Sequence, residues 1–484
     1  MSFAPEYIRI VLNENFEDFK KYFLSEMMAI EYAHLVMLVE RGIVPRSDGR
    51  KIRQSLDRID LGALRQVGYD GTCEDMFFYL ENLVMTECGQ DVGGHLNAAR
   101  SRNDVDMAMY RMRLREGLLA LFDATLKLRS SLLDVASRHT ATLFPAHTHT
   151  QPAQPTTVAH YLLAAIEELE RDVTRFKAAY LTTNRCPLGA CAITGTGFPI
   201  DRNRVSELLG FDAPTGNTYG SIATADWLIE STGSAVTALL GIGRLIQDFQ
   251  LWATREVGYL RLPDGFVQIS SIMPQKRNPV ALEHSRVLTS KAYVQMLAIP
   301  TVLHNTPFGD INDSEDDLQP LVATAFTDAT RAVELLAAAI AGAEFDVTLM
   351  RRRATESWVT VTELADFLAR DQKLPFRTGH SVAAKVVRLS GAEPDKSPAD
   401  LIAEASKEIS GQEIRLSEEV AAEVLSPEHF IAVRKTWGGP APEVVGAAID
   451  ESRKLLAADQ EELARLRGNL SAAERKLEEA SAEL

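Results

Sequence analysis

Residues 268–279 read QISSIMPQKRNP and concentrate reactive and polar side chains in one short loop. Ser270 can act as a base only if its alkoxide is stabilised or a neighbour removes its proton. Lys276 and the backbone amides of the loop could supply that stabilisation, and Asn278 adds a neutral donor. We therefore take this loop as the first candidate for a catalytic site.

A second polar segment, ARSRND, occupies residues 99–104. Arg100 and Arg102 could present planar forks of donors to carboxylates, and Ser101 and Asn103 would add neutral donors beside them. The alternative is an ordinary helix cap with solvated arginines, which this segment taken alone favours. The segment precedes a long helical pattern, where free backbone N–H groups suit an anion.

A third segment, HTHTQPAQP, occupies residues 147–155 and contains His149. A single histidine is more often a structural hydrogen-bonding group than a catalyst, so this segment is only suggestive. A metal site is disfavoured, because no cysteine or carboxylate lies at ligand spacing. Glu283, in the helix that follows the serine loop, could orient and charge a histidine brought from elsewhere in the chain.

Long helical patterns separate these segments, with apolar residues at three- and four-residue spacing. We expect helices over residues 106–139, 156–183, 223–257, 279–303 and 317–343. Several are apolar around most of their circumference, which predicts a bundle that also packs against other copies of the chain. The only expected strand is around residues 191–200, so the predicted fold is all-α.

The sequence divides into four parts: a helical domain over 1–105, the long-helix domain over 106–343, a small helical domain over 344–447 and a tail over 448–484. In the tail an apolar seam recurs every seventh residue, at Ile449, Leu456, Leu463, Leu470, Leu477 and Leu484. This heptad predicts either a coiled coil between subunits or an amphipathic helix lying on its own domain. The two interpretations have equal weight.

The chain has 484 residues and a net charge of -16, which disfavours nucleic acid or an anionic membrane as a partner. Its four cysteines show no zinc-type or disulfide pattern, and the N-terminus lacks the apolar run of a signal peptide. We therefore expect a cytoplasmic protein with reduced thiols.

The loop resembles the GSSxMPxKxN signature of the fumarase/aspartase superfamily, with Ile269 in place of the glycine. The chain is most similar to the argininosuccinate lyases of that superfamily. The segments that carry this resemblance are RSRND, the THxQxAQP pattern at 148–155, PLGACAITGTGFPIDR at 187–202, ELLGFDAPTGN at 207–217, LPFRTGH at 374–380 and GGPAP at 438–442.

The resemblance implies a three-domain, all-α chain whose long bundle is shared in a homotetramer, with each active site built from three subunits. It implies elimination of an amine from a succinyl group to release fumarate, without a metal or organic cofactor. The catalytic positions would be Ser270 as the base, Lys276, His149 and its partner Glu283. The substrate contacts would be Arg100, Ser101, Arg102, Asn103, Thr148, Gln154, Met273, Asn278, Asp310 and Glu315.

The match weakens at the amine end of the substrate. The family's YNKDMQEDKEPLF-like segment is represented by DINDSEDDLQPLV, in which Asp310 and Glu315 would repel a carboxylate. The family's NSLDAVSDRD becomes NTYGSIATAD, and its WGGRF-like segment is missing. We therefore expect an amine other than arginine, for example a diamine or amino acid, as in the ethylenediamine-disuccinate lyases. The alternatives are argininosuccinate lyase proper and a catalytically silent, crystallin-like relative.

Overall fold

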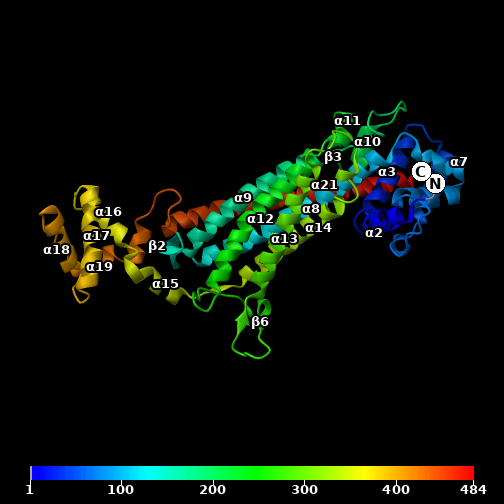
Figure 1. Ribbon diagram of the computed structural model, residues 1–484. Helices are drawn as coiled ribbons and strands as arrows, with labels where there is room; N and C mark the ends of the chain where they lie inside the picture. Colours follow the sequence, from blue (N-terminus) through cyan, green and yellow to red (C-terminus); the bar gives the residue numbers. More distant parts are fainter. Residues whose placement is uncertain (1–2) are drawn as a thin grey trace.

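The computed structural model describes residues 3–484 and shows an elongated, helical molecule. A bundle of long helices runs through its centre, an N-terminal lobe lies at one end and a small helical domain lies at the other (Figure 1). A short hairpin projects from the side of the bundle. The predicted all-α architecture is confirmed.

Six long helices form the bundle. Their bounds are α8 (Arg102–Arg138), α9 (Val158–Thr183), α12 (Asp226–Trp252), α13 (Val280–Leu303), α14 (Gln319–Ala341) and α21 (Pro442–Ala482). The first five begin and end within about five residues of the helices expected from apolar periodicity, because buried faces dictate that pattern wherever packing continues. Helix α8 packs against α9, α14 and α21, and is therefore buried around most of its circumference.

The N-terminal lobe contains short helices that share one hydrophobic core with the bundle. Its elements are α1 (Pro5–Tyr7), η1 (Ile8–Leu12), α2 (Asn13–Tyr22), α3 (Leu24–Glu40), α4 (Arg46–Asp57), α5 (Leu61–Leu64), α6 (Met76–Cys88), α7 (Gln90–Gly93) and η2 (Gly94–Asn97). Apolar side chains of α3, such as Met27 and Leu35, are completely buried in that core. The core does not break at residue 105.

The small domain at the opposite end has a separate hydrophobic core, built from residues such as Leu364, Val382 and Ile402. Its elements are α15 (Val347–Thr355), η5 (Glu356–Trp358), α16 (Val361–Arg370), α17 (Phe376–Ala392), α18 (Pro398–Ser410), α19 (Glu418–Val424) and α20 (Pro427–Ala432). In the sequence this domain lies between α14 and α21, so the chain leaves the bundle to form it and then returns.

The heptad seam of the tail is buried against the chain's own bundle. Along α21, Leu456, Leu463 and Leu470 are each less than 10% exposed, and the helix packs on α8, α9 and α3. An ion pair of 2.5 Å between Arg129 Nη1 and an oxygen of Asp459 ties α21 to α8. The structure thus favours the interpretation of the tail as an amphipathic helix on its own domain.

The strands are short and form four separate two-stranded pairs. They are β1 (Leu143–Thr148) with β2 (Gln151–Thr157), β3 (Arg185–Cys186) with β4 (Ala213–Pro214), β5 (Leu260–Arg261) with β8 (Glu344–Phe345), and β6 (Gln268–Ile269) with β7 (Arg277–Asn278). The connecting helices are α10 (Arg202–Leu208), α11 (Thr218–Ala223), η3 (Asp264–Phe266) and η4 (Asn312–Ser314).

The strand expected around residues 191–200 is absent from the structure, and this prediction was wrong. The segment forms turns, with φ of 53° at Cys191 and 81° at Gly195, angles that an extended strand does not adopt.

Within residues 3–484, no single helix is long and apolar enough to cross a membrane. One pair of helical segments, 5–22 and 24–40, together has the length and composition of a membrane span, but the two segments are bent by 78° relative to each other.

Candidate active site

Ser270 lies at the end of β6 in the hairpin that projects from the bundle. Strands β6 and β7 pair antiparallel, with Gln268 opposite Asn278. The backbone N–H groups of Ile272 and Met273 donate hydrogen bonds to Ser270 Oγ, at 3.4 and 3.1 Å. Both bonds favour a negative charge on that oxygen, because each aims a positive dipole end at it. The loop therefore aims two backbone donors at this oxygen.

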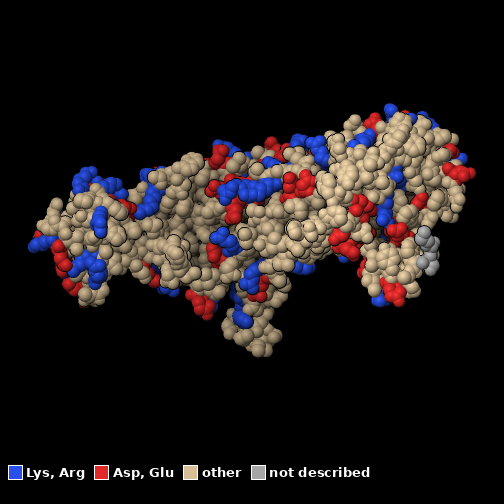
Figure 2. Space-filling model, turned by 45° about the horizontal axis from the view of Figure 1, so that its top comes forward, with Lys and Arg blue, Asp and Glu red and all other residues tan. Residues whose placement is uncertain are grey.

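Lys276, Met273 and the other side chains at the tip of this hairpin are exposed to solvent. Ile272 is 83% and Ile269 75% exposed, an unusual exposure for large aliphatic side chains. Figure 2 shows Lys and Arg atoms on the part of the projection that adjoins the bundle. Arg277 ties the end of the hairpin next to the bundle to η3 by donating a hydrogen bond to Asp264 at 2.5 Å.

His149 lies at the tip of the hairpin that joins β1 to β2. His149 and Thr150 both have positive φ, 51° and 63°, so the turn matches the mirror-image geometry of tight hairpins. Such angles are uncommon for residues other than glycine and often mark functional positions. His149, Thr148 and Gln154 are all exposed, and Gln154 Nε2 donates to Thr362 Oγ1 at 3.1 Å. The imidazole is thus presented outward on a fixed turn.

Arg100 is buried and already paired. Its Nη1 donates to Glu31 Oε2 at 2.6 Å and its Nη2 donates to Asn97 Oδ1 at 2.9 Å. The Arg100 and Glu31 side chains are only 2% and 4% exposed, so the guanidinium is enclosed with a carboxylate of its own chain. Its predicted contact with a succinyl carboxylate remains a prediction.

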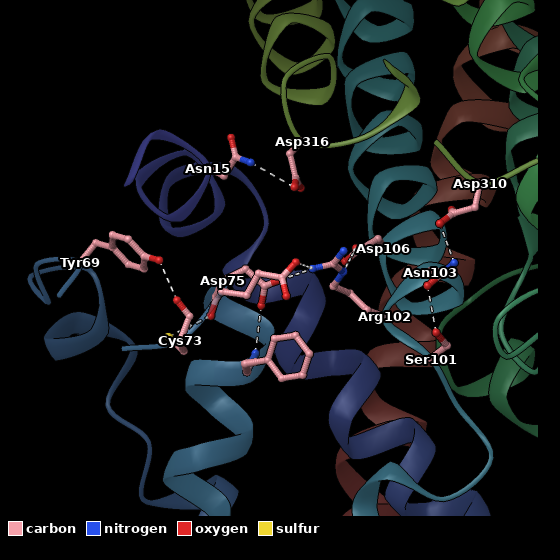
Figure 3. Close-up of polar contacts among 12 residues, drawn as sticks. Asn15, Tyr69, Cys73, Asp75, Ser101, Arg102, Asn103, Asp106, Asp310 and Asp316 are labelled. Atoms are coloured by element: carbon pink, nitrogen blue, oxygen red, sulfur yellow. Dashed lines mark hydrogen bonds and ion pairs between the residues drawn. The ribbon is translucent and has the colours of Figure 1, made fainter. Parts of the chain in front are cut away.

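Arg102 lies in the first turn of α8 and is surrounded by acids (Figure 3). Its Nη1 donates to Asp75 at 2.7 Å and to Glu74 at 2.9 Å. Ser101 caps the helix in a capping box with Asp104, whose carboxylate accepts the Ser101 N–H at 2.9 Å. The alternative of solvated arginines is therefore not observed, because both arginines of this segment form ion pairs.

Asn103 connects the N-terminus of α8 to the acidic segment before α14. The Ser101 hydroxyl donates to Asn103 Oδ1 at 2.9 Å, and Asn103 Nδ2 donates to Asp310 Oδ2 at 2.6 Å. Glu315, five residues further on, is buried beside Asp310, and burial together with that neighbouring carboxyl raises the pKa of Glu315 to about 8. The structure thus brings four predicted site residues from two segments together.

The three polar segments lie at separate places along one chain. In Figure 1 the hairpin of β2, the projection with β6 and the lobe that adjoins the start of α8 are well apart. Each segment leads into a long helix, as expected: α8, α9 and α13. Glu283, in the first turn of α13, is exposed, and among residues 3–484 no hydrogen bond joins it to His149.

Four acids that pair with Arg100 or Arg102 were not predicted from the sequence. They are Glu31, Glu74, Asp75 and Asp106. Only Asp106 had a local signal, because it is a charged residue in a helical run that is otherwise mostly apolar and has to be buried. Groups of three or more His, Cys, Asp or Glu that could hold a metal ion do not occur among the described residues.

Comparisons with known proteins identify the family of the chain. The family model described as Lyase matches residues 73–294, and the model described as Argininosuccinate lyase C-terminal matches residues 358–432. Argininosuccinate lyase 2 of Agrobacterium fabrum is 42% identical over 466 residues, covering 95% of this chain and 92% of the relative.

Two solved structures are similar over the whole chain. EDDS lyase in complex with formate has a TM-score of 0.88 and 31% identity, covering 100% of this chain and 96% of that chain. A variant of EDDS lyase with bound fumarate has a TM-score of 0.87 and 30% identity at the same coverage. With these relatives, the chain is a carbon–nitrogen lyase that releases fumarate. It belongs to the argininosuccinate lyase family of the fumarase/aspartase superfamily.

Proposed function

We propose that this lyase reversibly eliminates an amine other than arginine, such as a diamine or an amino acid, from an N-substituted aspartate. The observation that carries the proposal is the hydrogen bond of 2.6 Å from Asn103 to Asp310. It means that a carboxyl group adjoins the segment expected to bind the succinyl half of the substrate. Asp310 on this surface would repel the carboxylate of arginine, whereas Glu315 beside it is largely uncharged near neutral pH because its pKa is raised to about 8.

In the proposed reaction Ser270 removes a proton from the carbon next to a succinyl carboxylate. The electron pair left on that carbon forms the double bond of fumarate. The carbon–nitrogen bond breaks, and its electron pair leaves with the amine nitrogen. Lys276 and Asn278 stabilise the charge that builds up on the carboxylate before the bond breaks. The amides of Ile272 and Met273, which donate to Ser270 Oγ, support the role of this serine as the base.

His149 would exchange the proton of the departing amine, with Glu283 as its charge partner. Its exposed position on a fixed turn suits a group that serves a site completed by another copy of the chain. Thr148 and Gln154 flank it on the same hairpin and would contact substrate.

The complete site is assembled from three subunits of a homotetramer in this proposal. Exposed apolar side chains on α12 and α13 support such an assembly, since isolated bundles rarely leave so many uncovered. They are Leu240, Leu251, Val287, Val294, Leu297 and Val302. The exposed aliphatic residues of the β6–β7 hairpin fit the same explanation, with Met273 covering the substrate there.

Argininosuccinate lyase activity itself is the second candidate. The 42% identity to argininosuccinate lyase 2 of Agrobacterium fabrum favours it. Under this alternative the acids at Asp310 and Glu315 would contact the cationic end of arginine instead of excluding its carboxylate.

The test is fumarate consumption, followed by ultraviolet absorbance, with the purified protein and a panel of amines that includes arginine, ethylenediamine and common amino acids. Consumption with another amine and none with arginine supports the proposal. Consumption with arginine alone would identify an ordinary argininosuccinate lyase and overturn it.

A further inference from the structure

A cavity of about 460 Å³ lies between α8, the end of α9, the β3–β4 pair and the start of α12. Its charged lining residues are Arg111, Arg185 and Asp226, and Leu181 and Pro214 add apolar surface. None of its lining residues belongs to the three polar segments described above. The residues predicted for catalysis and substrate binding therefore do not account for this cavity.

Arg111 is one of three arginines of α8 that are buried, together with Arg115 and Arg129. Arg129 forms an ion pair with Asp459, and both Nη atoms of Arg115 donate to oxygens of the protein. Arg111 is only 3% exposed, yet it forms no ion pair with any carboxylate of residues 3–484. It is therefore a buried cation without a counter-ion.

The guanidinium of Arg111 is held on one edge and lacks partners on the other. Its Nη1 donates to the carbonyl oxygens of Thr182 and Thr183, at 3.1 and 3.4 Å. Its Cζ lies 4.6 Å from the ring centre of Trp227. Nε is buried without a hydrogen-bond partner, and in the part of the chain that the structure describes Nη2 donates to no protein atom. Nε and Nη2 together form the fork that binds a carboxylate through two parallel hydrogen bonds.

The missing partner is costly for the protein, because a buried charge is stable only when it is paired and hydrogen-bonded. Burial lowers the pKa of Arg111 to about 10, although the charge of Asp226 opposes that shift. The guanidinium is thus still cationic at neutral pH. A bound carboxylate would supply both missing acceptors and the missing negative charge.

The other two charged residues of the cavity, Arg185 in β3 and Asp226 in the first turn of α12, are exposed. Among residues 3–484 neither side chain forms a hydrogen bond or an ion pair. The cavity thus contains a second cation beside Arg111 and one carboxylate. A ligand that carries one carboxylate and one ammonium group matches these charges, whereas Asp226 would repel a second negative charge.

We propose that this cavity binds the zwitterion of an α-amino acid, with its carboxylate on Nε and Nη2 of Arg111 and its ammonium group on Asp226. Arg185 provides a second contact for the carboxylate. Leu181, which is 58% exposed, and Pro214 contact an aliphatic side chain. A volume of about 460 Å³ is within the usual range of small-molecule sites. The inference goes beyond the proposed function, because binding requires no turnover.

The experiment is a calorimetric titration of the full-length protein, in the absence of fumarate, with L-leucine and two analogues that each lack one charge. Isocaproate lacks the ammonium group, and isoamylamine lacks the carboxylate. We expect L-leucine to bind, isocaproate to bind about two- to fivefold more weakly, and isoamylamine to bind roughly ten- to a hundredfold more weakly. The larger loss reflects the buried fork, and the smaller one reflects the exposed Asp226.

Variants of the charged residues test each contact. Arg111→Lys keeps the buried charge but removes the fork, and it should weaken L-leucine binding by roughly ten- to a hundredfold. Arg185→Gln and Asp226→Asn change only exposed side chains and should weaken it by about two- to fivefold. Arg255→Gln and Asp313→Asn, at exposed positions outside the cavity, should leave it unchanged.

Asp226→Asn also separates a ligand contact from a structural role. This variant should weaken L-leucine but not isocaproate, because only L-leucine carries the ammonium group that Asp226 binds. If Arg111→Lys does not fold, the two exposed variants decide the outcome.

Equal affinity of the three compounds, or no heat with L-leucine at millimolar concentration, would overturn the proposal. It would also be refuted if Asp310→Asn abolished L-leucine binding while Arg185→Gln had no effect, since the amino acid would then occupy the proposed amine end of the active site. A changed oligomeric state of Arg185→Gln by light scattering, with unchanged L-leucine binding, would mean that another copy of the chain covers the cavity and would equally refute it.

Discussion

Replacing Glu315 with glutamine should stabilise the protein at alkaline pH and leave its stability unchanged at acidic pH. The pKa of Glu315 is raised from an ordinary value of 4.5 to about 8 by burial and by the Asp310 carboxyl. Between those two values the folded protein binds a proton that the unfolded chain releases. The free energy of unfolding therefore falls as the pH rises from about 4.5 to about 8.

The size of the effect follows from the same two values. Each pKa unit corresponds to about 1.4 kcal/mol, so the interval from 4.5 to about 8 sets a ceiling of about 5 kcal/mol. Because Asp310 shares the interaction, we expect Glu315→Gln to recover about 2–5 kcal/mol. A chain of 484 residues has an unfolding entropy of about 1 kcal/mol/K, so Tm should rise by about 2–5 °C.

Scanning calorimetry of the wild-type protein and Glu315→Gln at about pH 4, below the ordinary pKa of the carboxyl, and at about pH 9 checks this expectation. At the lower pH the two proteins should unfold together, because a protonated carboxyl and an amide are both uncharged. Asp313→Asn controls for the loss of an exposed charge. A rise in Tm of equal size at both pH values, or a lower Tm of the variant at pH 9, would refute the reasoning.

Three further outcomes are expected. Ser270→Ala should lower fumarate release by roughly a hundred- to ten-thousandfold without changing Tm or the oligomeric state, and a near-normal rate would exclude this base. Leu463→Ala, on the buried seam of α21, should lower the free energy of unfolding by about 2–5 kcal/mol, whereas Leu455→Ala, at a position 45% exposed, should lower it little. If Leu463→Ala instead makes the oligomer dissociate without lowering Tm, the seam forms a coiled coil between subunits. Glu31→Gln should lower Tm by leaving the charge of Arg100 buried and unpaired, at a cost of about 3–5 kcal/mol; a higher KM for fumarate with unchanged Tm would mean that Arg100 binds substrate.

The long helices could be predicted from the sequence because their signal is local. Apolar residues recur along α8 and α14 with the helical period, and the bounds of these helices follow from that pattern alone. The positions of the three polar segments could also be predicted, because each lies where such a helical pattern begins. The expected strand at 191–200 failed because turn-forming glycines interrupt a short apolar run.

The partners of the charged side chains could not be predicted. Arg100 pairs with Glu31, 69 residues away in the sequence, and no local pattern selects that carboxylate among the many in the chain. The same holds for the tail: a heptad predicts that the seam of α21 is covered, but it does not specify whether the cover is the chain's own α8 or another subunit.

The return of α21 to the bundle has a consequence for synthesis on the ribosome. This helix is made after the small domain, yet it covers α8, α9 and α3, which are made much earlier. At about 5–20 residues per second, roughly 15–70 s separate the emergence of α8 from that of the end of α21. During that interval the apolar groove that later receives Leu456, Leu463 and Leu470 is open to the solvent and to chaperones. The nascent chain therefore exposes this apolar groove until α21 is made.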